Sequence, residues 1–151
     1  PKFQMSDSLC FPMGEYVNPL EFVTAESVMD GDLTNTIKYT LEESINTTKA
    51  GNYPIEYRVT DSGGKTVYLS TQVEIVEREY TGIEVMLSEY LVYVEKGTEF
   101  RSTDYFVGSD IGGDLKIRSK VDTSMEGTYH VDYTVTSGSA KGKARLIVVV
   151  E

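Results

Sequence analysis

One pattern of residues occurs twice in this chain, about half the chain length apart. Ile45–Thr60 recurs as Val121–Thr136, with a glycine, a tyrosine and an alternating apolar segment at matching places. Each copy is followed by a further strand-like segment, Val73–Glu77 and Val148–Glu151. A repeat this long, with a complete strand pattern in each copy, predicts two small domains in tandem.

Period-two alternation within both copies predicts β-strands with one face on a core. Apolar or aromatic residues occupy the odd positions of 53–60 and of 129–136. Tyr57, Val59, Tyr133 and Val135 are therefore expected in the two cores. Glycine-containing segments follow each copy, at 60–65 and 137–142, and predict hairpin turns before a returning strand.

The rest of the chain also favours strands, and no window predicts a helix longer than a turn or two. A short helical turn is expected at 25–29. Further strands are expected at 3–5, 9–13, 20–24, 36–41, 82–87, 91–94, 100–106 and 115–119.

These patterns predict an all-β chain with two domains, residues 1–78 and 79–151. The boundary falls in the short polar segment 77–82, which lacks the Gly/Ser or Pro runs of a long spacer. With strands on both sides of so short a linker, we expect the two modules to lie roughly end to end with limited swing.

Charge and composition exclude several classes of partner. The chain carries 24 acidic and 14 basic residues, for a net charge of -10. Such a surface repels phosphate backbones and anionic membrane faces, so neither nucleic acid nor membrane is an expected partner. The longest apolar run, 146–150, is far too short to span a bilayer.

The reactive residue types do not suggest an enzyme. Cys10 and His130 are the only cysteine and histidine, and they lie in different halves of the chain. They form no plausible catalytic dyad, and Cys10 is expected to be a small buried residue. The chain begins at Pro1 without a methionine, so we expect it to be a trimmed piece of a longer protein.

The corner before each repeated strand resembles a feature of immunoglobulin-like sandwiches. Gly51–Ile55 and Gly127–Val131 share the pattern Gly-x-Tyr-x-apolar. The resemblance implies that Tyr53 and Tyr129 are tyrosine corners, whose hydroxyl groups tie the corner to nearby backbone. Ile55 and Val131 stand where the second disulfide cysteine would be, so this sandwich would contain no cysteine pair.

Longer motifs are similar to bacterial immunoglobulin-like surface modules of the DUF5011 and bacterial Ig-like group 3 type. They are Val23–Thr34, Ile45–Tyr53 and Tyr57–Gly64 in the first half and Val121–Tyr129 in the second. The second half departs from the pattern where Gly112–Leu115 replaces the acidic Asp-Gly-Asp-Leu motif. The resemblance implies two tandem immunoglobulin-like β-sandwiches in an extracellular protein of the bacterial cell surface.

The acidic loop of the first half is a candidate calcium site. Calcium prefers six to eight oxygen ligands from flexible acidic loops, and Asp30, Asp32, Glu26 and Asp61 could supply some of them. The alternative is that these aspartates accept backbone N–H bonds in Asx turns around Gly31. No other cofactor is expected.

Three functions are compatible with these observations. The first is a non-catalytic spacer or presentation module, with the flanking domains of the same polypeptide as partners. The second is an adhesin-type module that binds a host protein or glycan through loops or a tyrosine-bearing sheet face. The third is a pair of accessory domains of a larger surface enzyme.

Overall fold

The computed structural model describes residues 1–151, and its first half is a sandwich of two sheets. The order of one sheet is β1 (Lys2–Met5), β3 (Val23–Ser27) and β4 (Gly31–Asp32). The order of the other is β2 (Cys10–Pro12), β7 (Thr66–Val76), β6 (Gly51–Thr60) and β5 (Lys38–Leu41). A 3-10 turn, η1 (Thr34–Thr36), connects β4 to β5.

The second half repeats this plan. Its smaller sheet pairs β10 (Phe106–Ser109) with β8 (Val85–Leu87). Its larger sheet has the order β11 (Asp114–Ser119), β12 (Gly127–Ser137), β13 (Ala140–Val150) and β9 (Leu91–Val94). Two 3-10 turns, η2 (Arg78–Tyr80) and η3 (Ser102–Tyr105), complete the module.

The two larger sheets have matching topology. In each, the last strand pairs antiparallel with the strand before it and parallel with an early strand, β7 with β2 and β13 with β9. The prediction of an all-β chain with two tandem immunoglobulin-like sandwiches is confirmed. No helix in the structure is long and apolar enough to cross a membrane.

The repeated strands place their aromatic residues in the cores, as predicted. Tyr57 and Tyr133 are fully buried, and Val59 and Val135 are almost so. A buried phenol needs a hydrogen-bond partner. Each hydroxyl donates to a backbone carbonyl outside its own sheet, that of Tyr57 to Pro19 and that of Tyr133 to Ser102. Both cores therefore tie the β-sheet to a connecting loop.

Two local predictions are wrong. Residues 25–27 extend strand β3 instead of starting a helical turn, because Val23 and Ala25 both point into the core. The strand expected at 100–106 is largely the turn η3, and strand β10 begins at Phe106, where the expected strand ends. Ser, Thr and Asp side chains at 102–104 favour local turns over strand pairing.

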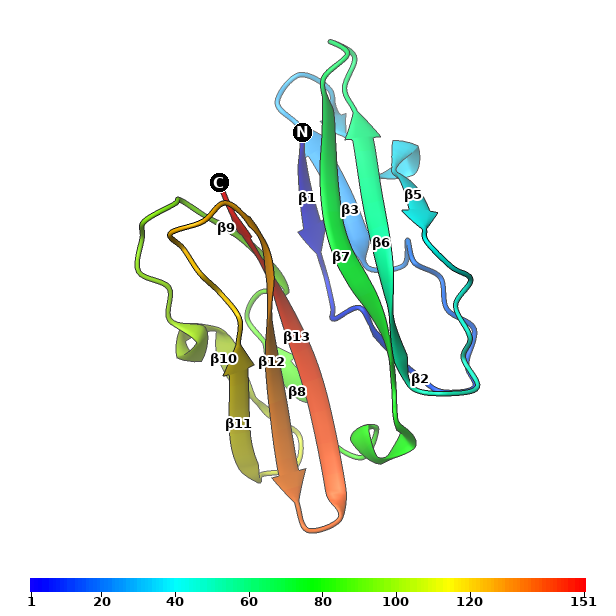
Figure 1. The fold of residues 1–151 in the computed structure, drawn as a ribbon, viewed down its shortest axis with the longest axis vertical. Coiled ribbons are helices and arrows are strands. Elements are labelled where there is room, and N and C mark those ends of the chain that lie inside the picture. The colour runs from blue at the N-terminus through cyan, green and yellow to red at the C-terminus, as the bar shows by residue number, and fades with distance from the viewer.

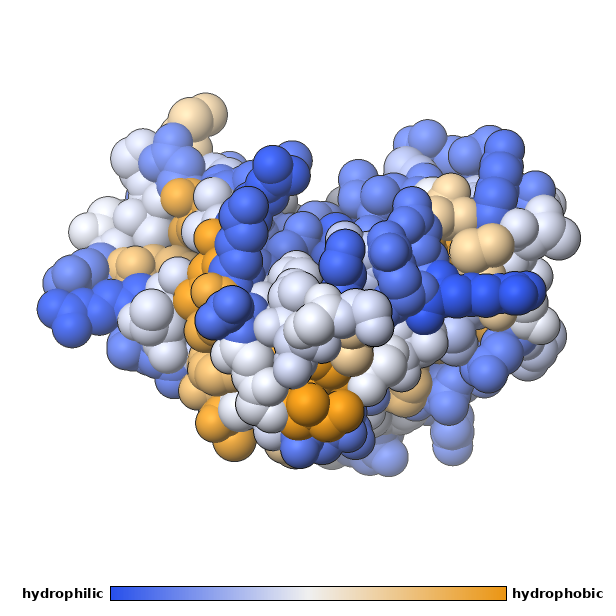
Figure 2. Space-filling model, turned by 90° about the horizontal axis from the view of Figure 1, so that it is seen from below, coloured by the Kyte–Doolittle hydropathy of each residue, from blue (hydrophilic) through white to orange (hydrophobic).

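The two modules lie side by side, and the expected end-to-end arrangement is wrong (Figure 1). The Lys2 ammonium lies 4.0 Å from the Glu151 carboxylate, so the first and last strands meet at one end of the molecule. The linker turns back through η2, and Thr81 then forms a β-bridge with Gly142 of β13. Seen from below, the modules form two lobes with a hydrophilic notch between them (Figure 2).

Apolar packing explains why the modules turn towards each other. Leu91 of β9 and Ile147 of β13 are buried in the same hydrophobic cluster as Phe3 and Leu9 of the first module. Strand β13 is buried on both faces from Ala144 to Val148, as a strand covered on both sides requires. The first core is therefore completed by residues of the second module.

Gly142 is where the returning linker crosses β13 most closely. A Cβ atom at this position would overlap the backbone carbonyl of Ile83, whereas nothing lies near a Cβ atom at Gly112. We expect Gly142→Ala to lower the free energy of unfolding by about 1–3 kcal/mol, as other overpacked sites do. Gly112→Ala is the matched control in urea unfolding. Equal unfolding midpoints for the two variants would contradict the observed linker path.

Candidate functional site

A buried guanidinium group joins the two modules. Arg145 on β13 donates from Nε to Asp132 Oδ1 at 2.7 Å, within its own module. Its Nη2 atom lies 3.7 Å from Glu74 Oε1, and its Nη1 atom donates to Asn52 Oδ1 at 3.4 Å, both in the first module. One side chain thus bonds to strands β6, β7 and β12.

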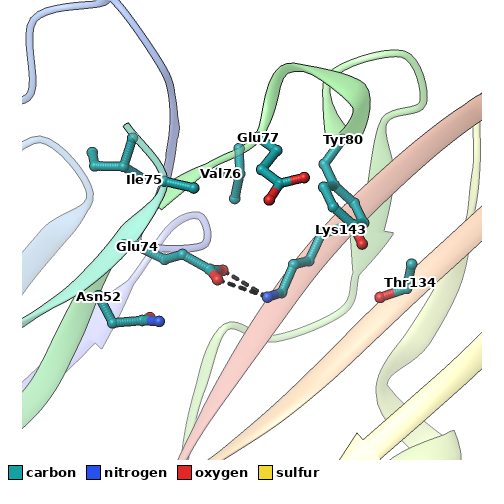
Figure 3. A pocket seen from close by; sticks show the side chains of 10 residues that line it. Asn52, Glu74, Ile75, Val76, Glu77, Tyr80, Thr134 and Lys143 are labelled. Atoms are coloured by element: carbon teal, nitrogen blue, oxygen red, sulfur yellow. Dashed lines mark hydrogen bonds and ion pairs between the residues drawn. The ribbon is translucent and has the colours of Figure 1, made fainter. Parts of the chain in front are cut away.

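Lys143 adds a second cation to this cluster. Its Nζ atom lies 2.8 Å from Glu74 and 3.9 Å from Asp132, and Figure 3 shows its ion pair with Glu74 across the interface. The cluster contains two cations and two carboxylates, so its formal charge is zero. Side-chain exposure ranges from 7% for Arg145 to 22% for Asp132, so solvent screens these pairs weakly.

Residues of the N-terminal segment close the cluster. The Ser8 hydroxyl accepts the backbone N–H of Arg145 at 2.9 Å. The Cys10 thiol lies 3.5 Å from Glu74 Oε1, and it is partly buried. Burial, followed by the nearby Glu74 charge, raises the pKa of the Cys10 thiol well above its usual value, which favours the protonated form of the sulfur.

His130 on β12 bonds to the first module beside this cluster. Its Nε2 atom is 2.8 Å from the Thr71 hydroxyl oxygen. Burial and the positive charge of Arg145 lower the pKa of His130 to about 4. Burial alone would raise the pKa of Asp132, but the hydrogen bond and charge of Arg145 outweigh it and hold that pKa below its usual range. The interface therefore keeps a neutral histidine and an ionised aspartate.

An open cleft of about 360 Å³ lies along the same interface. Figure 3 shows its lining, which comes from both modules and from η2: Asn52, Glu74, Glu77, Tyr80, Thr134 and Lys143 among others. The lining offers carboxylates, an ammonium, an amide and a phenol. Two of these groups, Glu74 and Lys143, bond to each other and so hold the two modules together at the cleft.

The predicted calcium ligands Asp30 and Asp61 lie in two loops that touch. Asp30 Oδ2 accepts the backbone N–H of Ser62 at 2.8 Å. Hydrogen bonding by the Ser62 side chain, followed by this backbone bond, lowers the pKa of Asp30. Asp61 Oδ1 accepts the backbone N–H of Lys65 at 3.0 Å, within the β6–β7 hairpin. The Asp30 carboxylate therefore ties the β3–β4 turn to the hairpin, and the Asp61 carboxylate stabilises the hairpin turn itself.

The other two predicted ligands lie on the β3–β4 pair. Asp32 Oδ1 accepts the backbone N–H of Thr34 at 2.9 Å, and Glu26 is opposite Asp32 in the strand register. No group of three or more His, Cys, Asp or Glu side chains is arranged to hold a metal ion. Calcium binding by Asp30, Asp32, Glu26 and Asp61 stays a prediction. Of the three aspartates, only Asp32 accepts the backbone bond of an Asx turn, whereas Asp30 and Asp61 accept backbone N–H groups further along the chain.

Tyr53 and Tyr129 occupy equivalent corners of the two modules. The Tyr53 hydroxyl accepts the backbone N–H of Asn46 at 3.0 Å and donates to its carbonyl at 3.2 Å. The Tyr129 hydroxyl donates to the carbonyl of Met125 at 2.8 Å. Both phenols thus bond to backbone a few residues upstream.

Sequence reasoning missed the four charged residues of the interface, Glu74, Asp132, Lys143 and Arg145. One signal was available: the run 146–150 is apolar at every position and not at alternate ones. A strand with apolar residues on both faces needs a covering layer on each. Lys143 and Arg145, which precede this run, would then lie at the edge of the layer that packs on the strand.

Comparison with known proteins gives one family and several similar chains. The sequence matches the family described as "Bacterial surface protein, Ig-like domain" over residues 3–75 and 87–149. It is 31% identical over 147 residues to the pesticidal crystal protein Cry22Aa of Bacillus thuringiensis. That match covers 88% of this chain but 19% of the relative, so the chain spans about a fifth of the relative's length.

Two solved structures are similar over most of the chain. The CBM51-2 and INT domains of Clostridium perfringens ZmpB give a TM-score of 0.44 at 15% identity, over 91% of this chain and 30% of that one. The lipoprotein BT2262 of Bacteroides thetaiotaomicron gives a TM-score of 0.39 at 11% identity, over 97% and 98%.

Removal of the Arg145 guanidinium should destabilise the pair of modules strongly. Arg145→Met leaves Asp132 and Glu74 with one cation between them, and loss of one partner from a buried ion pair costs about 3–5 kcal/mol. Arg101→Met removes an exposed pair with Glu99 and should change the free energy of unfolding by less than about 1 kcal/mol. Chemical denaturation of both variants compares them directly, and equal losses would contradict the buried cluster.

The lowered pKa of His130 predicts that the folded protein loses stability in mild acid. Between pH 6.5 and pH 4 the unfolded chain protonates His130 while the folded chain does not, so stability falls as the pH falls through this window. The full effect is about 3 kcal/mol. His130→Gln should flatten the dependence of the unfolding free energy on pH there. Parallel curves for variant and parent would show that His130 is not held neutral.

Proposed function

Because this chain belongs to the bacterial surface protein family with Ig-like domains, we propose that it is a non-catalytic presentation module. In this proposal it lies outside the cell, in a cell-surface or secreted protein, and holds flanking domains of the same polypeptide in a fixed relation. The observation that carries the proposal is the buried ion cluster between the modules. From the motifs at 23–34 and 45–53 we assign the first module to the DUF5011 type.

A fixed relation between the modules is supported by the nature of their contact. Arg145, Lys143 and His130 of the second module each bond to a residue of the first. Swing of one module about the linker would leave Glu74 partly buried beside fewer cations. Because an unpaired buried charge is costly, the interface opposes such motion.

The geometry favours a compact block over a stalk segment. Lys2 and Glu151 lie close together, so polypeptide on either side of this unit would meet it at the same end (Figure 1). A rod-like spacer would have these residues at opposite ends. In this proposal the unit orients its neighbours instead of adding its full length to a fibre.

The proposal that these modules belong to a larger protein is supported by the length of a similar protein. The similar crystal protein of Bacillus thuringiensis contains the matching region as a minor part of its chain. We propose that the present modules likewise serve as accessory domains beside parts with other functions. Host-protein or glycan binding is less favoured, because the most exposed tyrosines, Tyr16 and Tyr68, lie on a loop and on β7 and do not share one strand.

The proposal predicts a narrow distance distribution between the modules. In a Cys10→Ala background, spin labels at Lys38→Cys on β5 and Lys116→Cys on β11 sit on the outer strands of the two larger sheets. Pulsed electron spin resonance should give one narrow distance peak. The same labels in Arg145→Met should give a broader one, because the ion cluster is incomplete. A broad distribution in the parent would overturn rigid presentation.

A further inference from the structure

Positive charge gathers on one face of the second large sheet. Six of the 14 lysine and arginine residues lie there, because the strand register places them on one side: Lys116, Arg118, Lys120, Lys141, Lys143 and Arg145. Register also sets Thr134 between Lys116 and Lys143, and Asp132 between Arg118 and Arg145. In a chain of net charge -10 this face is an exception.

The first module covers the half of this face that β13 provides. Glu74 lies against Lys143 and Arg145, and Lys141 lies 3.8 Å from Glu79. Glu74 of the first module and Glu79 of the linker turn η2 thus provide acidic partners for all three β13 cations. The β13 half of the face therefore already binds an acidic strand-borne partner.

The half of the face that consists of β11 and the next residue, Lys120, has no such partner. Lys116, Arg118 and Lys120 are exposed and form no ion pair. They occupy alternate positions along an extended chain, so neighbouring charges are about 6.6–6.8 Å apart. We call these three residues the basic strip.

The strand that carries the basic strip has a free edge. β11 is the outermost strand of its sheet, on the side away from the first module (Figure 1). The Lys120 N–H donates to His130 of β12, and N–H groups alternate in direction along an antiparallel strand. The N–H groups of Leu115, Ile117 and Ser119 therefore point away from the sheet, where no backbone partner exists.

We propose that the β11 edge is a docking site for an extended acidic segment of another polypeptide, which adds to the sheet as a further strand. Such a segment would carry carboxylates at alternate positions, opposite the basic strip. Apolar residues between them would lie against Leu115, which is 39% exposed, and Ile117. Strand addition satisfies the free backbone groups, and the alternate side chains give specificity.

The free backbone groups favour a peptide over other polyanions. A phosphate or sulfate polymer would satisfy the three cations but would leave the N–H groups of the edge and the apolar side chains unmatched. A second copy of β11 is disfavoured, because antiparallel pairing of two such strands sets like charges opposite each other. An acidic strand would pair with the cations, the free N–H groups and the apolar side chains of the β11 edge.

A short designed peptide tests this site on the whole chain. The probe is acetyl-Thr-Glu-Val-Glu-Val-Glu-Thr-amide, and its control has the same composition with the three glutamates adjacent. Titration followed by NMR should shift the amides of Leu115, Ile117 and Ser119 and slow their hydrogen exchange. The control peptide should bind at least several-fold more weakly, because its charges do not match alternate positions.

Charge reversal provides the matched test on the protein side. Lys116→Glu with Arg118→Glu should weaken peptide binding about tenfold or more, since two attractive pairs become repulsive. Lys49→Glu with Lys96→Glu changes net charge equally at exposed sites outside β11 and should leave affinity within about twofold. Melting curves of both variants establish that they are folded.

Three outcomes would overturn the proposal. Equal binding of the alternating and the rearranged peptide, or of inorganic polyphosphate at the same amides, would show a charged strip with no strand docking. Undiminished binding of a peptide with N-methyl groups at alternate amides would lead to the same conclusion, without any protein variant. No binding, together with self-association of the charge-reversed protein, would show that the cations only protect an edge strand from pairing.

Discussion

The position of every element relative to the other module depends on the ion cluster around Arg145. Its guanidinium is almost fully enclosed, so it must be neutralised on all sides by groups that stay in place. Asp132 supplies one side from the same sheet, and Glu74 and Asn52 supply the others from the first module. Buried ion pairs contribute little net stability compared with apolar packing. We infer that their effect here is specificity, because Glu74 and Asn52 must both face Arg145 for its guanidinium to be neutralised and hydrogen-bonded.

Burial of apolar side chains stabilises the contact between the modules, and the ion cluster sets their relative placement. A domain of about 75 residues buries a modest fraction of its surface, so each sandwich alone has a small core. Leu91 and Ile147 extend the first core from the second module. Separation of the modules would expose these residues to water together with two carboxylates and two cations. We therefore regard the pair as one folding unit, although each half has its own sheets and its own tyrosine corner.

Strands, turns and the repeat could be predicted from the sequence, whereas the contacts between the two modules could not. Alternation around Tyr57 and Tyr133 predicts half-buried strands, and the repeat predicts two of each element, because both features act within a few residues of the chain. The placement of the modules depends on contacts such as Glu74 with Lys143, which no local pattern encodes. The candidate calcium loop shows a similar limit. The sequence around Asp30 is the same whether its carboxylate binds calcium or accepts a backbone N–H from another loop, and only the position of Ser62 shows which bond the structure contains.

The two modules have the same strand arrangement but different side chains on the outer face of the larger sheet. This difference determines which sheet the other module packs against. Cross-strand pairing of Tyr57 with Leu69 and of Tyr133 with Ala144 aligns the two hairpins. In that alignment Ser70 of the first module corresponds to Arg145 of the second, and Tyr68 corresponds to Lys143. The first hairpin therefore offers neutral, exposed side chains where the second offers cations. A further copy of the first module would find no cations at these positions of the first hairpin, so the ion cluster that joins the two modules cannot form again on that face.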